Sequence, residues 1–302
     1  MRRVRFVALG DSLTEGVGDP VGSGSGSGSG SGRGSRTGVR VGGRWRGWAA
    51  LLAAGLAEEP VEFTNLAVSG AQTSDVAARQ LPAGLALRPD VVSVVVGVND
   101  TLRGTFDVGE IAARLDTVYS AFTGQGALLL TACLPDPGTM LGLPGVLARP
   151  LARRQRAVNA VVHALSERYG AVHLHACEGD WVTDRAMWSA DRLHPGEGGH
   201  RQLALRFHTL LAERGTATGP APSPDHGSPA PTGPASLWWL ATAGTGWVAR
   251  RCVDLLPQLL TLAVDELRHR ARGTSTRLDL RASAAVAAAL AALSATERPE
   301  AA

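Results

Sequence analysis

The chain has 302 residues, of which 44% are hydrophobic and 19% are charged, and its formal net charge is +3. This length accommodates one α/β domain of ordinary size with an appendage, and the apolar content is sufficient for a full core. The small net charge and the absence of a base-reading motif argue against a nucleic-acid partner. The chain has three widely spaced cysteines, Cys133, Cys177 and Cys252, and no CxxC pair. This pattern is typical neither of a disulfide framework nor of a zinc site.

The amino terminus starts with Met1-Arg2-Arg3 and continues into the apolar run Val4–Leu9. The charged start resembles that of a signal peptide, but the run is too short for an export segment and no small-residue cleavage site follows it. We therefore interpret the run as the first strand of a sheet and expect a cytoplasmic protein. No stretch reaches the roughly 20 apolar residues that span a bilayer, so we expect no transmembrane segment.

Five short segments, rich in β-branched and other apolar residues, have the length of buried strands. These segments are Val4–Leu9, Val61–Leu66, Val91–Val96, Ala127–Cys133 and Ala171–His175. Helical patterns alternate with them, at residues 45–56, from 74 or 75 onward, and at 107–122, 150–169 and 196–213. Strands that alternate with helices without hairpin signals predict a three-layer α/β/α sandwich around a central parallel five-stranded sheet.

The rest of the chain divides by composition. A Gly-Ser repeat within residues 20–38 is typical of a flexible insertion, either a tolerated loop expansion or a mobile flap beside the site. The domain is expected to span 1–214, and a Pro/Gly-rich linker follows at 215–236. An amphipathic helical segment at 237–272 forms the expected C-terminal appendage, and the Ala-rich tail at 273–302 is expected to be disordered.

The expected appendage carries Trp238, Trp239 and Trp247, and Pro257 is expected to kink it. Its tryptophans fit peripheral contact with a membrane surface. Because the stretch lacks a strongly basic polar face, packing onto the domain or onto a second copy of the chain is the favoured alternative. The oligomeric state stays open at this point.

Three sequence motifs follow predicted strands, and a fourth precedes the last predicted helix. They are Gly10-Asp11-Ser12-Leu13 after the first strand, Gly70 after the second, Gly97-Val98-Asn99-Asp100 after the third, and Asp191-Arg192-Leu193-His194 before the helix. The carboxyl ends of parallel strands share one edge of a sheet, where ligands bind. Together the motifs resemble blocks I, II, III and V of the SGNH hydrolases (GDSL-type lipases and esterases) over about residues 4–213. The Gly-Ser insertion departs from the family pattern at the mouth of the expected site.

The resemblance implies a serine hydrolase that uses neither metal nor cofactor. Ser12 is the expected nucleophile, His194 the base that accepts its proton, and Asp191 the carboxylate that orients the imidazole. The expected oxyanion donors are the backbone N–H groups of Ser12 and Gly70 and the side-chain amide of Asn99. Taken singly, these residues also fit ordinary turns and a helix cap. Their shared order and their placement favour catalysis.

Other polar residues near the motifs receive structural interpretations. Asp11 and Asp100 are expected to be hydrogen-bond acceptors in a turn and a loop. His173 and His175 lie two positions apart on a predicted strand and therefore share a face. Because the sequence arranges no carboxylate or Cys beside them, we expect a solvated or core pair and no metal site.

The predicted substrate is a small-molecule ester with a small or medium acyl chain. Eight apolar residues before His194 either line an acyl pocket or pack beneath a long loop. They are Met140, Leu141, Leu143, Val146, Leu147, Trp181, Met187 and Trp188. Alternatives on the same site are a carbohydrate O-deacetylase and a thioesterase or acyltransferase. An alternative of another class is a non-catalytic module that binds a partner or a membrane surface.

Overall fold

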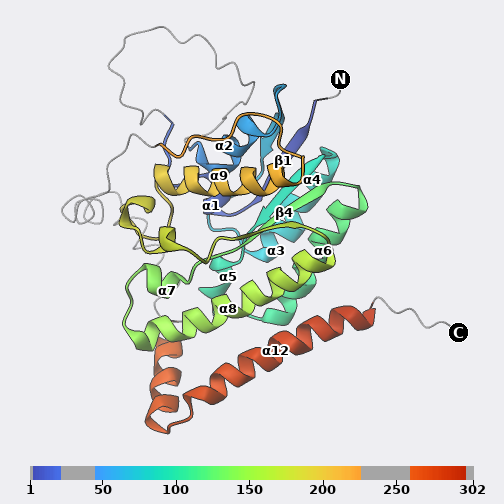
Figure 1. Ribbon diagram of the computed structural model, residues 1–302. Coiled ribbons are helices and arrows are strands. Elements are labelled where there is room, and N and C mark those ends of the chain that lie inside the picture. The colour runs from blue at the N-terminus through green and yellow to red at the C-terminus, as the bar shows by residue number, and fades with distance from the viewer. Residues whose placement is uncertain (1–2, 22–44, 226–258, 297–302) are drawn as a thin grey trace, which may run out of the picture.

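A parallel sheet of five strands forms the centre of the protein (Figure 1). The computed structural model describes residues 3–21, 45–225 and 259–296. The strands are β1 (Arg5–Gly10), β2 (Glu62–Asn65), β3 (Val91–Val95), β4 (Leu128–Cys133) and β5 (Val172–His175), in the order β2-β1-β3-β4-β5. The predicted parallel sheet is therefore confirmed, and each strand begins and ends within one residue of its expected segment.

Helices cover both faces of the sheet, as the α/β/α prediction requires (Figure 1). They are α2 (Gly47–Gly55) and α9 (Glu197–Glu213) on one face, with α6 (Val108–Gly124) and α8 (Gly145–Arg168) on the other. Alternate residues of β1 separate into two cores: Phe6 packs with α2 and α9, whereas Val7 packs with α6 and α8. The rings of Trp48 and Phe207 stack at 4.9 Å between centroids and join α2 to α9.

The helix expected from residue 74 or 75 onward is divided into three pieces. They are α3 (Thr73–Asp75), the π-helical turn η1 (Val76–Gln80) and α4 (Leu81–Ala86). Pro82 lacks the N–H that an uninterrupted helix needs, and the wider π turn lies directly before it.

The helix expected at 150–169 starts earlier than predicted, at Gly145. We expected Pro150 to open it, because proline is favoured in a first helical turn. The structure places Pro150 in the second turn, where its missing N–H removes one hydrogen bond. The helix continues through this position because the rest of its length packs on the sheet and on α6.

The expectation of a disordered tail at 273–302 is wrong for residues 275–296. These residues form α12 (Ser275–Thr296), which lies along α6 and α8 on the outside of the sandwich (Figure 1). Alanine has the highest helix propensity, and Ala289 is buried against α6 and α8 with Val286 and Leu293 partly buried beside it. The spacing of these three residues defines one face of a helix.

Of the expected appendage at 237–272, residues 259–271 are helical. The three tryptophans and the expected kink at Pro257 lie outside the described residues. Within the described part, Ser275–Ala295 is long and apolar enough to cross a membrane by length and composition, a feature that our expectation of no transmembrane segment missed. In this structure the same helix packs against the domain.

Short elements connect the main ones. They are α1 (Ser12–Glu15), α5 (Val98–Thr101), α7 (Pro137–Met140) and the 3-10 turns η2 (Asp180–Val182) and η3 (Arg185–Met187). Two of them, α1 and α5, begin directly beyond β1 and β3, which are neighbours in the sheet. The order of the strands reverses at β1, and the carboxyl ends of the strands at such a point form a natural ligand site.

Candidate active site

Ser12 lies at the start of α1, immediately beyond the carboxyl end of β1. The preceding Gly10 has φ 147°, and a Cβ there would collide with the carbonyl oxygen of Val95 on β3. A glycine therefore lets the chain turn this closely against the neighbouring strand. Asp11 caps the helix by accepting a hydrogen bond from the N–H of Leu13 at 3.0 Å.

The structure brings Ser12, His194 and Asp191 into one hydrogen-bonded chain. Nε2 of His194 lies 2.8 Å from Oγ of Ser12, and Nδ1 lies 2.7 Å from Oδ2 of Asp191. An ionised carboxylate accepts only, so Nδ1 carries the proton and Nε2 accepts the hydrogen bond from the Ser12 hydroxyl. In this tautomer the imidazole is ready to receive the proton of Ser12.

Asp191 is held in place by three further donors. Its Oδ1 accepts hydrogen bonds from the Ser189 hydroxyl at 2.6 Å and from the N–H groups of Leu193 and His194 at 2.9 and 3.0 Å. Burial alone would raise the pKa of Asp191, but the hydrogen bonds from His194 and the charge of its imidazole outweigh burial and hold the pKa well below its ordinary value. Asp191 is therefore a carboxylate over the whole neutral and mildly acidic range.

The loop that carries this pair is fixed at both ends. The N–H of Ser189 donates to the carbonyl of His194 at 2.9 Å, and Trp188 bridges to Pro195 in antiparallel fashion. Arg192, at the tip of the loop, has φ 60°, a left-handed conformation that costs about 1–3 kcal/mol in a residue other than glycine. The surrounding hydrogen bonds stabilise this strained turn and thereby set the direction of the His194 side chain.

Asn99, at the end of β3, is bonded to the segment of Ser12. Its Nδ2 donates to Oδ2 of Asp11 at 3.1 Å and to the carbonyl of Ala71 at 3.0 Å. Asp11 is buried, and this burial raises its pKa to about 6, opposed mainly by the hydrogen bond from Leu13. Asp11 was expected to serve a local turn, but it also positions Asn99, which no local sequence pattern indicates.

Asp100 acts as the expected acceptor and links two motifs. Its carboxylate accepts hydrogen bonds from the N–H of Thr73, at 3.1–3.2 Å, and from the hydroxyl of Thr73, at 2.7 Å. Burial raises the pKa of Asp100, and the hydrogen bonds from Thr73 oppose that rise. These hydrogen bonds join Thr73, three residues after Gly70, to α5, which follows β3.

Gly70 lies in a turn with φ 84°, a conformation that favours glycine. The adjacent Ser69 donates its N–H to Glu15 at 2.8 Å, which anchors this turn to α1. Ser69, Ser12 and Asn99 line one cavity, whereas Gly70 is not among its lining residues. Within the described chain, the N–H groups of Ser12 and Gly70 donate no hydrogen bond to other residues.

The cavity beside Ser12 and His194 has a volume of about 200 Å³ and a mainly apolar wall. Its apolar lining includes Leu134, Pro135, Met140, Leu141, Leu143, Leu151, Trp181, Trp188, Leu193 and Leu259. Of the eight residues expected here, Val146, Leu147 and Met187 are not part of the lining. Sequence reasoning missed Leu259, because nothing in the pattern of the C-terminal segment indicates that it reaches the site.

Comparisons with known proteins agree with the fold described above. Two mutants of one acetylxylan esterase from Geobacillus stearothermophilus, which is also described as an acetyl-xylooligosaccharide esterase, are 21% and 20% identical, each covering 69% of this chain and 94% of its own with a TM-score of 0.53. A GDSL-like lipase from Parabacteroides merdae is 16% identical over 70% of this chain and 96% of its own, with a TM-score of 0.56. At these identities the likeness establishes the fold. No curated protein matches the sequence.

The sequence profile of the GDSL-like Lipase/Acylhydrolase family matches residues 8–202, which include all four motifs. The match extends from β1, before Ser12, into α9, beyond His194. The chain thus belongs to the GDSL-like lipase/acylhydrolase family and is a hydrolase of ester bonds.

Proposed function

We propose that this protein is a serine esterase that cleaves carboxylic esters with apolar acyl groups through Ser12, His194 and Asp191. The observation that carries the proposal is the hydrogen-bonded chain from Asp191 through His194 to Ser12, which opens onto an apolar cavity. A hydroxyl is a weak nucleophile until a neighbouring base accepts its proton. In this proposal His194 is that base and Asp191 is its carboxylate partner.

In the first half of the reaction, Oγ of Ser12 attacks the acyl carbon while its proton passes to Nε2 of His194. Asp191 stabilises the imidazolium that forms. The tetrahedral oxyanion collapses, the alcohol leaves with the proton from His194, and the acyl group stays on Ser12. In the second half, water attacks this acyl-enzyme, with His194 again as the base, and the carboxylic acid is released.

The oxyanion is stabilised by the N–H groups of Ser12 and Gly70 and by the Asn99 amide. The free state of the two N–H groups supports this role. The Asn99 amide has two acceptors within the protein, so its contribution requires sharing or exchanging one of these hydrogen bonds. One well-placed donor of this kind contributes about 10²–10³ in rate.

A serine-directed fluorophosphonate tests the chemistry. It is expected to modify the wild-type protein covalently, with fluoride as the leaving group, and to leave Ser12→Ala unlabelled. Ser69→Ala is the matched control, because Ser69 lines the same cavity but is bonded through its backbone to Glu15. Folded wild-type protein that resists the reagent, or a Ser12→Ala variant that is still labelled, contradicts the proposal and favours a non-catalytic module.

The mainly apolar wall favours an alkyl acyl group over a sugar in this cavity. Acetylated sugars stay the second candidate substrate, because the fold is similar to that of the acetylxylan esterase. Rates on nitrophenyl esters of graded acyl length, measured beside an acetylated xylooligosaccharide and an acyl thioester, separate these candidates. Higher kcat/KM on the acetylated sugar than on every alkyl ester would reject the alkyl assignment.

A further inference from the structure

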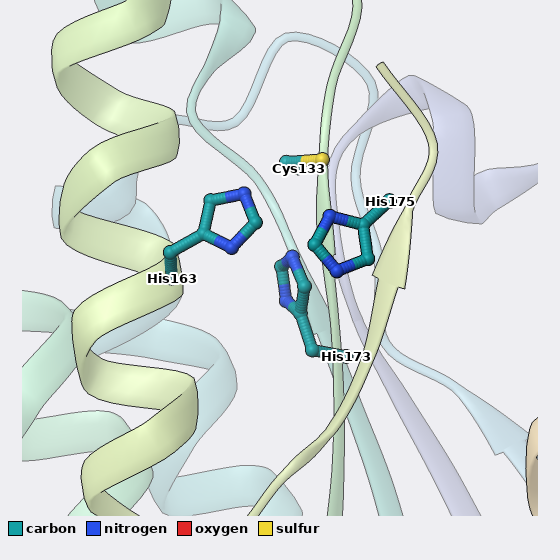
Figure 2. Close-up of side chains that lie close together, drawn as sticks. All are labelled: Cys133, His163, His173 and His175. Atoms are coloured by element: carbon teal, nitrogen blue, oxygen red, sulfur yellow. The ribbon is translucent and has the colours of Figure 1, made fainter. Parts of the chain in front are cut away.

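A cluster of three histidines and one cysteine lies on the α8 side of the sheet, separate from Ser12 (Figure 2). Its members are Cys133 from β4, His163 from α8, and His173 and His175 from β5. Each residue offers one ligand atom, and these four atoms all lie within 4.8 Å of one another. Adjacent imidazole rings are 4.3–5.0 Å apart between centroids.

The topology of the fold explains why these residues meet. In the register of the parallel pair, Cys133 lies opposite His175, and Thr131 lies opposite His173. Residues two apart on a strand point to the same face, so both histidines and Cys133 face α8. His163 projects from α8 toward them, as Figure 2 shows. The sequence pattern revealed the histidine pair alone, since the other two residues reach it only through the fold.

The hydrogen bonds around His173 fix its tautomer. Oγ of Ser166 donates to the carbonyl of Val162 at 2.6 Å, so the hydroxyl of Thr131, at 2.7 Å, donates to Ser166. Nδ1 of His173 then donates its proton to Oγ1 of Thr131, 2.9 Å away. This leaves Nε2 with a lone pair, and that buried atom has no hydrogen-bond partner among the described residues. A metal-binding histidine shows this same arrangement, with one nitrogen anchored and the other free.

The sulfur of Cys133 lies beside that of a second cysteine. Sγ of Cys177 lies 2.9 Å away. Either thiol can donate its S–H to the other, and Sγ of Cys133 also donates to the carbonyl of Leu174 at 3.7 Å. Neutral imidazoles and a thiolate are the forms that bind metal ions.

We propose that Cys133, His163, His173 and His175 bind a divalent transition-metal ion, zinc by preference, in tetrahedral geometry. Nitrogen and sulfur ligands in this number are the set that Zn²⁺ prefers. With ligand bonds of about 2.0–2.3 Å, the ligands of a tetrahedral site are about 3.3–3.8 Å apart. The present spacing of up to 4.8 Å therefore needs a closure of about 1 Å, within the reach of side-chain rotation.

The proposed ion joins the edge strand β5 to β4 and α8, next to the ester site. Cys133 and His175 are the last residues of their strands, and the residues that follow them, Leu134 and Ala176, line the substrate cavity. Asn159, one helical turn before His163, bonds both the N–H and the carbonyl of Leu134 at 2.9–3.0 Å. The ion is structural and lies behind the cavity wall, so it takes no part in the proposed ester chemistry.

Cobalt(II) titration of full-length protein, free of a histidine tag and reduced with a phosphine, tests the site. We expect one equivalent of Co²⁺ to give the ligand-field bands of tetrahedral coordination and a sulfur-to-metal charge-transfer band, both abolished by zinc. His163→Ala is expected to weaken binding at least 100-fold, and Cys133→Ser to remove the charge-transfer band. His269→Ala and Cys177→Ser, which leave the four ligands intact, are expected to keep the tetrahedral spectrum. An octahedral spectrum, or equal affinity in His163→Ala, overturns the proposal.

Thermal unfolding gives a second measurement that does not depend on the spectrum. Zinc at 100 times its Kd shifts the folding equilibrium about 100-fold toward the native state. We expect zinc to raise the Tm of the wild type and of Ser12→Ala. We expect it to leave the Tm of His163→Ala unchanged. Ser12→Ala lacks the proposed nucleophile but keeps the four metal ligands. Its Tm shift with zinc therefore tests the metal site whether or not the esterase proposal holds. Equal shifts in wild type and His163→Ala contradict the site.

Discussion

Oδ2 of Asp11 accepts a hydrogen bond from Nδ2 of Asn99 at 3.1 Å, although 88 residues separate them in the chain. The contact joins the carboxyl ends of β1 and β3, the two neighbouring strands that carry Ser12 and Asn99. A buried carboxylate thus positions one expected oxyanion donor next to the expected nucleophile. The same burial makes Asp11 a titrating group whose charge affects stability.

Asp11→Asn is expected to be more stable relative to wild type at pH 7 than at pH 4. Burial raises the pKa of Asp11 from 3.8 to about 6, so its protonated form stabilises the native state fully below pH 3.8, and that contribution is lost as pH rises through 6. The asparagine cannot ionise and avoids this loss, which amounts to about 3 kcal/mol at most. Urea unfolding of both proteins at the two pH values measures the difference.

The control for this experiment is Asp265→Asn, at a side chain that is 57% exposed. Its charge stays in water in both states, so we expect little change with pH. If the difference in unfolding free energy between Asp11→Asn and wild type is the same at pH 4 and pH 7, the buried carboxyl does not titrate in this range.

Asp191→Asn is expected to lower kcat by about 10⁴-fold with little change in KM, because the asparagine amide favours the wrong imidazole tautomer. It should also destabilise the protein at neutral pH. The pKa of Asp191 is held below its ordinary value, so the carboxylate stabilises the native state above pH 3.8, and this contribution is lost as pH falls through the lowered pKa. The gap in unfolding free energy between variant and wild type should therefore narrow below pH 3.8.

Kinetics with a nitrophenyl ester, together with urea unfolding at pH 7 and pH 3, measure both effects. Asp180→Asn, an exposed position in the same region, is the matched control and should retain activity. A full-rate Asp191→Asn enzyme would remove Asp191 from the proposed triad.

The strands and the placement of the motifs were predictable, because they depend on local pattern. Val91–Val96 consists of valines apart from Ser93, which is typical of a strand covered on both faces, and a parallel sheet brings the ends of its strands to one edge. From those two facts, Ser12 and Asn99 were expected at one rim, and they line a common cavity.

The contacts that the sequence did not reveal are all between distant segments. His163 lies beside the β5 histidines, and Leu259 lines the cavity, because of tertiary packing. Such packing produces no periodic pattern in the sequence. The tail 273–302 was misjudged for a different reason. Its alanines resemble low-complexity sequence, and the weak apolar stripe around Ala289 becomes meaningful only once α6 and α8 offer a surface for it.

The cavity predicts a dependence on acyl length. Burial of one methylene contributes about 0.8 kcal/mol, so kcat/KM should rise about fourfold per methylene until the cavity is filled. Leu143→Trp narrows the cavity and should shift the optimum toward shorter chains while leaving the acetyl ester nearly unaffected. Initial rates on a series of nitrophenyl esters measure this, with Leu280→Trp, 70% exposed on α12, as control. An unchanged length profile in Leu143→Trp would place the acyl chain elsewhere.

At the base of the Gly-Ser insertion, Asp19 and Arg46 form a bidentate ion pair at 2.8–2.9 Å. The side chain of Asp19 is fully buried, and Arg46 also contacts the buried Glu197 at 3.2 Å. Arg46→Met leaves a buried carboxylate without its cation, and we expect a loss of about 3–5 kcal/mol in the free energy of unfolding. Arg79→Met is the control, because that side chain is 83% exposed and 3.8 Å from Asp75, and should cost under about 1 kcal/mol.

The same pair predicts that the insertion itself is dispensable for folding. Arg46 donates its N–H to the carbonyl of Asp19 at 2.9 Å, and Pro20 bridges to Trp45, so contacts between described residues on either side of 22–44 already hold the flanking segments together. Replacing 22–44 by a short glycine turn should leave Tm within a few degrees of wild type, since each halving of a loop changes its closure free energy by only about 0.6 kcal/mol. A deletion variant as unstable as Arg46→Met would instead show that residues 22–44 hold the Asp19–Arg46 pair together.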